Sequence, residues 1–291
     1  MTRQDLRRRR NTWPGASPDE YPELGPHPLS PDHAQLLTAA ALAGLLGLLV
    51  GSFLNVVAHR VPRGKSVVHP PSACPHCGNA IRNRHNVPVL GWLILRGRCF
   101  DCQEPISVRY PLVELGTGLI FAGIGARFAD EPRLLAAYLA FTALAVALAL
   151  IDLDVRRLPN ALVLPAYPVL AGLLLIGWDG HALWRAGVAG ASLFAFYFLV
   201  AMLAPGAMGF GDVKLAGVVG GMLGYLSWGA FLTGAFGAFV LGSLVGIGLL
   251  VTGRAGRKTA VPFGPFMLAA AVASVLGAGG LGEAYLRSLG L

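Results

Sequence analysis

The sequence predicts an all-α polytopic membrane protein, with about eight transmembrane helices and a small loop domain between the first two. Three observations lead to this fold class. Apolar residues make up 55% of the 291 residues and charged residues only 13%, whereas soluble domains carry about 25% charge. Several apolar runs are long enough to cross a bilayer. The 39 glycines fit the same class, because small residues let membrane helices pack closely.

The chain divides into four segments. Residues 1–34 are rich in proline and polar residues and are predicted to form a disordered tail. The first transmembrane helix follows at 35–58 and is not a cleavable signal, because the basic cluster of the tail lies too far before it. Residues 59–109 form a loop domain, and residues 110–291 form a core of seven helices. Those helices are expected at 111–128, 134–153, 161–178, 182–204, 213–226, 229–252 and 262–281.

Glycines four residues apart recur in the predicted helices. Gly47 and Gly51 form one such pair, and Gly217 and Gly221 form another. We interpret these glycines as helix-packing positions, because a helix face without side chains lets a neighbouring backbone come close.

The distribution of Lys and Arg orients the predicted helices. If the loop domain is cytoplasmic, the inside segments between residues 60 and 258 hold fourteen Lys and Arg residues and the outside segments hold four. Cytoplasmic loops of membrane proteins carry this excess. The same distribution argues against nucleic-acid binding as the reason for the net charge of +8. We expect the basic loop residues to contact lipid headgroups instead.

The loop domain contains two Cys-x-x-Cys pairs, Cys74 with Cys77 and Cys99 with Cys102, separated by 21 residues. This spacing predicts a tetrahedral zinc site, because each pair supplies two thiolates from one tight turn. The alternative is a disulfide or redox pair, which a reducing cytoplasm disfavours. Four protein ligands complete the coordination sphere, so a structural zinc is expected. The sequence has no HExxH motif, which argues against a metalloprotease.

Two carboxylates at the ends of apolar runs are the candidate catalytic groups. Asp212 follows Gly209 and Gly211, which would let an extended peptide approach the acid. Asp152 ends another apolar run on the same predicted side of the membrane. We predict that Asp152 and Asp212 form an aspartyl-protease dyad. Two adjacent carboxylates do not ionise together easily, so one would take a proton from water while the other donates one to the scissile carbonyl.

Both aspartates also have structural interpretations. Asp152 and Asp154 could form an interfacial cluster with Arg156 and Arg157, and Asp212 could be a helix N-cap. Asp154 is a rival to Asp152 for the catalytic position. The two lie about 200° apart around a helix, so only one of them should face Asp212. Helical geometry alone does not choose between them.

The chain resembles the type IV prepilin peptidases, the bacterial leader peptidases of the GxGD aspartic class. The resemblance covers about residues 45–270 and rests on several motifs in the family's order. These are 51–62 (GSFLNVVAHRVP), the two cysteine pairs, 109–114 (RYPLVE), 151–160 (IDLDVRRLPN), 209–214 (GFGDVK) and 262–265 (PFGP). The tail has no obvious counterpart in the family.

The resemblance implies roles for several residues. In this family the first catalytic aspartate precedes the Pro-Asn element by seven residues, as Asp152 precedes Pro159, and the second is that of the GxGD motif, Asp212. It implies removal of the basic leader of prepilins or pseudopilins, for type IV pili or protein secretion, at the cytoplasmic face of the bacterial inner membrane. It also implies N-methylation of the new terminus with S-adenosylmethionine, for which the sequence shows no fingerprint of a methyl-donor site.

Two other classes of function are compatible with parts of the sequence. Carboxylates at a membrane edge also occur in ion-coupled transporters and channels, but no clear inverted repeat is visible. A non-catalytic scaffold of a secretion system could use the cysteine loop for docking. The identity of the substrate and the oligomeric state are left open by the sequence.

Overall fold

The computed structural model describes residues 31–204, 208–253 and 262–290 of the chain. Nearly all of the predicted disordered tail therefore lies outside the described residues. Met1–Ala34 and Gln35–Leu291 form separate units, and the architecture below is that of the second unit.

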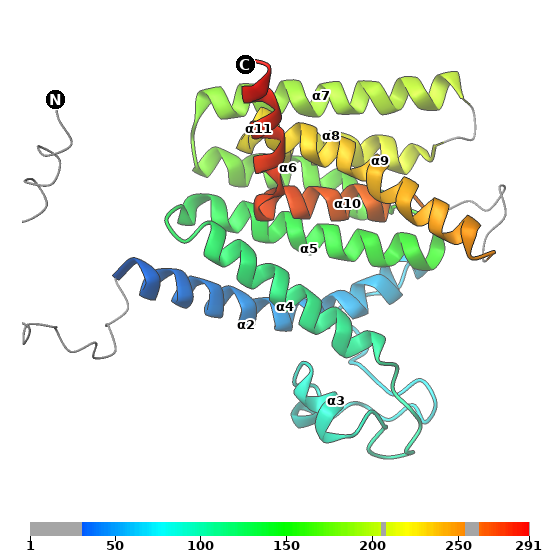
Figure 1. Ribbon diagram of the computed structural model, residues 1–291. Helices are drawn as coiled ribbons and strands as arrows, with labels where there is room; N and C mark the ends of the chain where they lie inside the picture. The colour runs from blue at the N-terminus through cyan, green and yellow to red at the C-terminus, as the bar shows by residue number, and fades with distance from the viewer. Residues whose placement is uncertain (1–30, 205–207, 254–261, 291) are drawn as a thin grey trace, which may run out of the picture. The chain divides into compact units, whose positions relative to one another are not determined.

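The described part of the chain is helical and contains no β-strand, only two isolated β-bridges in the cysteine loop. Each predicted transmembrane run coincides with helical structure, and the last run spans two helices joined by a π-helical turn at Ser274–Ala278. The helices (Figure 1) are α2 Pro31–Arg60, α3 Leu90–Ile94, α4 Arg109–Arg127, α5 Pro132–Val155, α6 Asn160–Ile176, α7 Gly180–Leu203, α8 Phe210–Leu226, α9 Trp228–Val251, α10 Gly264–Ala273 and α11 Gly279–Ser288.

Five segments are long and apolar enough to cross a membrane: His33–Arg63, Pro132–Val155, Gly180–Leu203, Trp228–Val251 and Gly264–Ser288. The predicted class of all-α polytopic membrane protein is thereby confirmed. Helices α6 and α8 have 17 residues each, a length of about 25 Å against a hydrocarbon core of about 30 Å. Both are therefore slightly short to cross the core unaided.

Helix α8 is the central element of the bundle. It contacts α6, α7, α9 and α10, and 11 of its 17 residues are buried. Helix α9 is the opposite case, because large apolar side chains such as Phe236, Leu244 and Val251 remain exposed along it. Such a surface suits contact with lipid tails. The candidate residue Asp212 lies in the first turn of α8, so the most enclosed helix presents it.

Helices α7 and α8 lie side by side and antiparallel (Figure 1), and they pack closely because glycines remove side chains from the contact. A Cβ atom at Gly220 would lie 2.7 Å from the carbonyl oxygen of Ala189. A Cβ at Gly224 would lie 3.0 Å from that of Arg185. The backbones are therefore closer than any larger residue would allow.

The predicted packing role of Gly47 and Gly51 is confirmed at the contact between α2 and α4. A Cβ at Gly47 would lie 2.8 Å from the carbonyl oxygen of Thr117, and one at Gly51 would lie 2.8 Å from Cα of Glu114. The side chain of Asn55 donates a hydrogen bond of 3.3 Å to the carbonyl oxygen of Tyr110. This bond satisfies a polar group that would otherwise be costly within an apolar helix.

The close packing of α7 on α8 predicts a position-specific effect of adding one methyl group. Gly220→Ala should destabilise the protein by about 1–3 kcal/mol, because the new Cβ meets backbone that cannot move away easily. Gly187→Ala is the matched control, because Gly187 lies in α7 with nothing within 4 Å of its Cβ position and alanine is the better helix former. Thermal unfolding in detergent should show a lower Tm for the first variant only. Equal shifts would contradict the described packing.

Candidate active site

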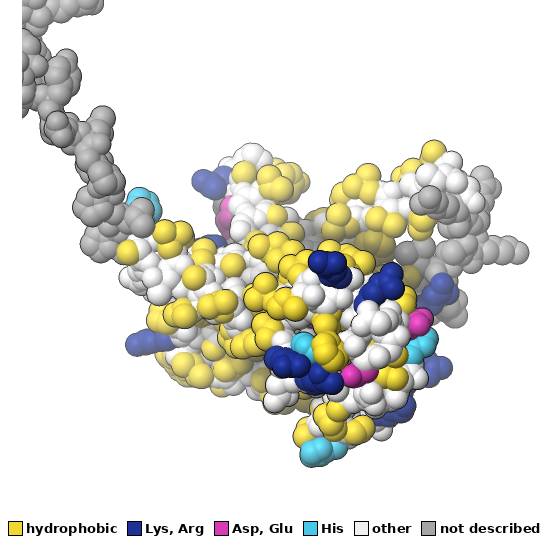
Figure 2. Space-filling view, turned by 90° about the horizontal axis from the view of Figure 1, so that it is seen from below, with side chains coloured by type: hydrophobic (Ala, Val, Ile, Leu, Met, Phe, Trp, Pro, Cys, Tyr) yellow, Lys and Arg dark blue, Asp and Glu magenta, His cyan; other side chains and the backbone are white. Residues whose placement is uncertain are grey.

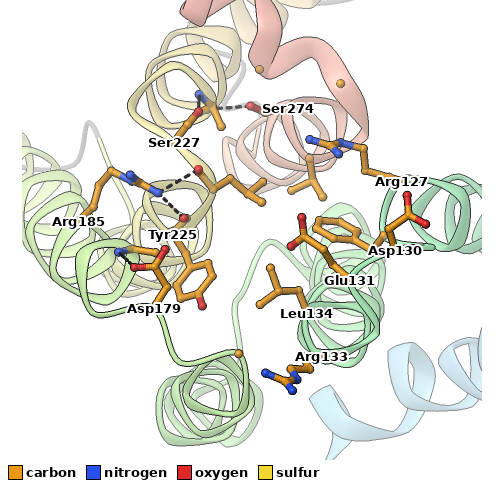
Figure 3. A pocket seen from close by; sticks show the side chains of 18 of the residues that line it. Arg127, Asp130, Glu131, Arg133, Leu134, Asp179, Arg185, Tyr225, Ser227 and Ser274 are labelled. Atoms are coloured by element: carbon orange, nitrogen blue, oxygen red, sulfur yellow. Dashed lines mark hydrogen bonds between the residues drawn. The ribbon is translucent and has the colours of Figure 1, made fainter.

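Two cavities lie at opposite ends of the helix bundle. One, of about 740 Å³, is lined by residues 61–63, by 152 and 155–159 after α5, and by 209–212 at the start of α8. The other, of about 910 Å³, is lined by the start of α5 and the end of α8 (Figure 3). Because the same two helices contribute opposite ends to the two cavities, both predicted aspartates fall at one end of the bundle.

Four polar side chains of the larger cavity form hydrogen bonds to the backbone of the surrounding helices (Figure 3). Asp179 accepts hydrogen bonds from the first backbone N–H groups of α7. The Arg185 guanidinium donates to the carbonyl oxygens of the last residues of α8. Ser227 caps α9, and Ser274 donates to Ala230. These bonds satisfy groups that helix termini otherwise leave unpaired, so this cavity has a structural explanation.

The smaller cavity contains both predicted catalytic residues, and their carboxylates converge on Gly264. A Cβ atom at Gly264 would lie 2.7 Å from Oδ2 of Asp152 and 3.3 Å from Oδ1 of Asp212. Because both distances start from one point, the two oxygens are no more than the sum, 6.0 Å, apart. Gly264 thus leaves room for both acids to face each other. The motif 262–265 is part of the resemblance, but no sequence pattern predicts that its glycine lies beside both aspartates.

Asp212 is the third residue of α8, whose N-cap is Gly209, so the alternative interpretation of Asp212 as an N-cap is wrong. Its carboxylate instead reaches back to the backbone N–H of Gly209, as acidic residues at this helical position commonly do. A Cβ at Gly209 would lie 3.1 Å from Oδ2 of Asp212. The other carboxylate oxygen, Oδ1, is buried and has no hydrogen-bond partner among the described residues.

Two contacts hold the segment after α5 against the start of α8. Gly211 lies close to Leu158, since a Cβ at Gly211 would lie 3.0 Å from Cβ of Leu158. The Lys214 ammonium donates a hydrogen bond of 3.1 Å to Oδ1 of Asn160 and lies 5.1 Å from the centre of the Phe210 ring. These contacts bring together the two sequence segments that carry the candidate acids.

Asp152 and Asp154 have different environments. Asp152 is only 5% exposed and lines the cavity with Asp212, and the backbone N–H of Gly264 faces it. Asp154 is more exposed and forms a two-pronged ion pair with Arg109, at 2.6 and 2.8 Å. The proposed cluster with Arg156 and Arg157 is therefore wrong for Asp154. Arg109 was missed as its partner because the two residues are 45 positions apart.

The four cysteines of the loop domain come together as the spacing predicts. Their sulfur atoms all lie within 4.8 Å of one another, and Sγ of Cys74 lies 3.7 Å from Sγ of Cys102. Sulfurs at the corners of a tetrahedron around zinc, with Zn–S bonds of about 2.3 Å, lie about 3.8 Å apart. The two pairs sit in matching turns, in which the N–H groups of Gly78 and Gln103 donate to the carbonyl oxygens of Cys74 and Cys99.

The surroundings of Cys74 favour its thiolate. Backbone N–H groups of Cys77 and then His76 lower the pKa of Cys74 to about 6. Arg82 contacts the second turn, since its guanidinium lies 3.1 Å from Asp101 and over the ring of Phe100. Figure 2 shows Lys and Arg side chains gathered on the face that carries this loop. These features fit a metal site that binds deprotonated sulfur.

Two further contacts join the loop domain to the helices. The buried carboxylate of Glu114, in α4, accepts a hydrogen bond of 2.7 Å from the backbone N–H of Val89. The ion pair of Arg109 with Asp154 links the end of the loop domain to the last turn of α5. Glu114 is part of the motif 109–114, yet its contact with a residue 25 positions earlier could not be seen in the sequence.

The ion pair of Arg109 with Asp154 should contribute little to stability. Both side chains are partly exposed, and pairs of this kind are worth about 0.2–1 kcal/mol. We expect Asp154→Asn and Arg109→Gln to lower the Tm by similar small amounts, and the double variant by no more than the larger of the two. A double-mutant cycle, in which the Tm values of the wild type, the two single variants and the double variant are compared, measures this coupling. Losses that add up independently would show that the two residues do not form a pair.

Comparisons with known proteins show which family the chain belongs to. Residues 45–128 match the model described as the bacterial Peptidase A24 N-terminal domain, and residues 139–281 match that of the type IV leader peptidase family. A prepilin leader peptidase/N-methyltransferase of Burkholderia pseudomallei (strain 1026b) is 38% identical, covering 81% of this chain and 84% of its own.

Two further relatives carry the same name. The protein of Aeromonas hydrophila is 36% identical over 85% of this chain and 94% of its own, and that of Bacillus subtilis (strain 168) is 32% identical over 80% and 92%. No solved structure matches the chain. The first family model covers the four cysteines and the second covers Asp152 and Asp212, and the chain belongs to the type IV leader peptidase family.

Proposed function

We propose that this protein is a membrane aspartic endopeptidase that removes the leader of type IV prepilins or pseudopilins, with Asp152 and Asp212 as its catalytic dyad. The observation that carries the proposal is the convergence of the two carboxylates on Gly264 within one cavity. Membership of the leader peptidase family and the names of the relatives support the substrate class. The same membership disfavours the transporter and scaffold alternatives.

The proposed reaction is general acid–base hydrolysis without a covalent intermediate. The ionised carboxylate takes a proton from water while the water oxygen attacks the scissile carbonyl carbon. The neutral carboxyl donates its proton to the carbonyl oxygen, which gives a tetrahedral diol. Proton transfer to the amide nitrogen then breaks the C–N bond, releasing the leader as a carboxylic acid and the mature protein with a new amine. Because the pair titrates as a unit, the acid and base roles alternate within it.

The cavity is suited to a substrate whose cleavage site lies at a membrane edge. It is open between η1 (Val61–Arg63), the end of α5 and the start of α8, so an extended segment could enter beside the acids. The distribution of Lys and Arg along the sequence, fourteen in the predicted inside segments against four in the outside ones, supports a cytoplasmic active site. We place the enzyme in the bacterial inner membrane, with its basic loops on lipid headgroups.

The cysteine cluster is proposed to hold one structural zinc ion. Four thiolate donors at tetrahedral spacing fit zinc, and they leave no coordination position for a substrate. When bound, the ion would stabilise the fold of a loop that has little apolar core of its own. This loop connects α2 to α4 through η1, which lines the active-site cavity.

Methyl transfer enters the proposal through the relatives, which are named leader peptidase/N-methyltransferase. We propose that this chain also methylates the new amine with S-adenosylmethionine. The product of the first reaction is the substrate of the second, because cleavage generates the amine that is methylated. We assign none of the described residues to the methyl donor.

Removing either acid should stop cleavage while leaving the protein inserted in the membrane. Asp152→Asn and Asp212→Asn should each lower kcat/KM by at least about a hundredfold, because neither single group can act as both acid and base. Asp154→Asn is the matched control, two residues away in the same helix but paired with Arg109, and should retain activity. The readout is cleavage of a prepilin in detergent or proteoliposomes. Normal processing by both dyad variants would refute the mechanism.

The metal proposal has a stoichiometric test. Purified protein should contain about one zinc per chain, as expected for a closed four-cysteine site, and X-ray absorption should report four sulfur neighbours. Cys77→Ser should lose the metal and make the loop sensitive to limited proteolysis, whereas Asp152→Asn should keep both properties. Full zinc content in the cysteine variant, or a disulfide in the protein purified under reducing conditions, would contradict the assignment.

A further inference from the structure

A buried tyrosine near the dyad has no hydrogen-bond partner. Tyr197, in α7, is 0% exposed, yet its hydroxyl bonds to nothing in the described part of the chain. Only two other buried side-chain atoms among the described residues share this property, Oγ1 of Thr142 and Oδ1 of Asp212. Buried polar groups without a partner are rare and call for an explanation. Two of these three atoms, the Tyr197 hydroxyl and Oδ1 of Asp212, lie toward the end of the bundle that holds the candidate site.

The register of α7 against α8 places Tyr197 at the level of Asp212. Ala189 lies beside Gly220, and the two helices are antiparallel. Tyr197 comes eight residues after Ala189, and Asp212 comes eight residues before Gly220. Both therefore lie about 12 Å further along the same contact, at the end of the bundle that holds the candidate site.

The aromatic surroundings of Tyr197 point to the same location. Its ring centre lies 5.9 Å from those of Phe239 and Phe263. Phe263 immediately precedes Gly264, on which both carboxylates converge. Asp212 is close enough to act electrostatically on the phenol. The ring is thus held by packing, at the end of the bundle that holds Asp212 and within its electrostatic reach.

The dyad is otherwise nearly symmetric in the backbone groups beside it. Each carboxylate faces one backbone N–H, that of Gly264 for Asp152 and that of Gly209 for Asp212. A donor on one side would break this symmetry, because a carboxylate with more donors carries the negative charge more easily.

We propose that Tyr197 is a positioning residue that donates its phenolic hydrogen bond, through one bound water, to Oδ1 of Asp212. This inference rests on the proposed role of the dyad. A bridging water costs little compared with a direct bond and satisfies two buried polar atoms at once. The bond biases the negative charge of the pair toward Asp212 and its proton toward Asp152. Asp212 is then the group that accepts a proton from the attacking water.

Other charged groups near the pair do not replace this donor. Asp152 faces Asp212 from α5, and the side chains of Arg63, Arg156 and Arg157 belong to residues that line the cavity. Lys214, on the same helix as Asp212, is bonded to Asn160. None of these cations bonds to Oδ1 of Asp212, which has no partner among the described residues.

The test is Tyr197→Phe, which removes only the hydroxyl. We expect kcat/KM for prepilin cleavage to fall about tenfold to a hundredfold, the range for one hydrogen bond to a charged group. The acidic limb of the pH profile should move to higher pH, because the ionised dyad loses a donor and needs a higher pH to form. The Tm should not fall, since the hydroxyl has no protein partner to lose.

Tyr138→Phe is the matched control. Tyr138 is also 0% exposed, but its hydroxyl donates to the carbonyl oxygen of Met222 at 3.0 Å. This variant should lose thermal stability and keep the pH profile. An unchanged acidic limb in Tyr197→Phe, or an equal shift in both variants, would overturn the inference. Asp152→Asn and Asp212→Asn belong in the same assay: if they are inactive while Tyr197→Phe is normal, only the tyrosine assignment fails.

Discussion

The structure depends on the approach of two carboxylates at one end of an apolar helix bundle. Asp152 and Asp212 come from helices α5 and α8 and meet beside the backbone of Gly264. Two buried acids this close repel each other when both are ionised, so the surrounding protein must hold them together. It does so through the contact of Gly211 with Leu158 and the bond from Lys214 to Asn160. The motifs around the acids are therefore also the packing contacts of the site.

The rest of the fold holds the N-terminal end of α8, which carries Asp212, in place. The helix is enclosed by α6, α7, α9 and α10, and glycines let α7 approach its backbone along the whole contact. Arg185 and the groups of the opposite cavity complete the far end of the same helix. The cysteine loop is attached near the acids through Arg109, whose partner Asp154 lies two residues after Asp152. The ion pair of Arg109 with Asp154 thus connects the loop domain to the helix that carries Asp152.

Much of this arrangement could be predicted from the sequence, because composition and apolar runs report on the membrane and short motifs report on local turns. The all-α polytopic class is confirmed, and the four cysteines cluster as their spacing predicts. The choice between Asp152 and Asp154 could not be derived from helical geometry, because it depends on Arg109, which is 45 positions away. The positions of Gly264 and Tyr197 could not be predicted either, because both depend on contacts between helices that are far apart in the sequence. The break of the last helix at Gly277, whose φ is 136°, left no clear signal either.

We propose that Asp152 and Asp212 act as one catalytic unit. The most direct measurement compares kcat/KM of Asp152→Asn and Asp212→Asn with that of the double variant in one cleavage assay. Residues that function as a unit are strongly non-additive, so the double variant should be no less active than the weaker single variant. If the losses of the two single variants multiply in the double variant, the carboxylates act independently and the shared dyad is wrong.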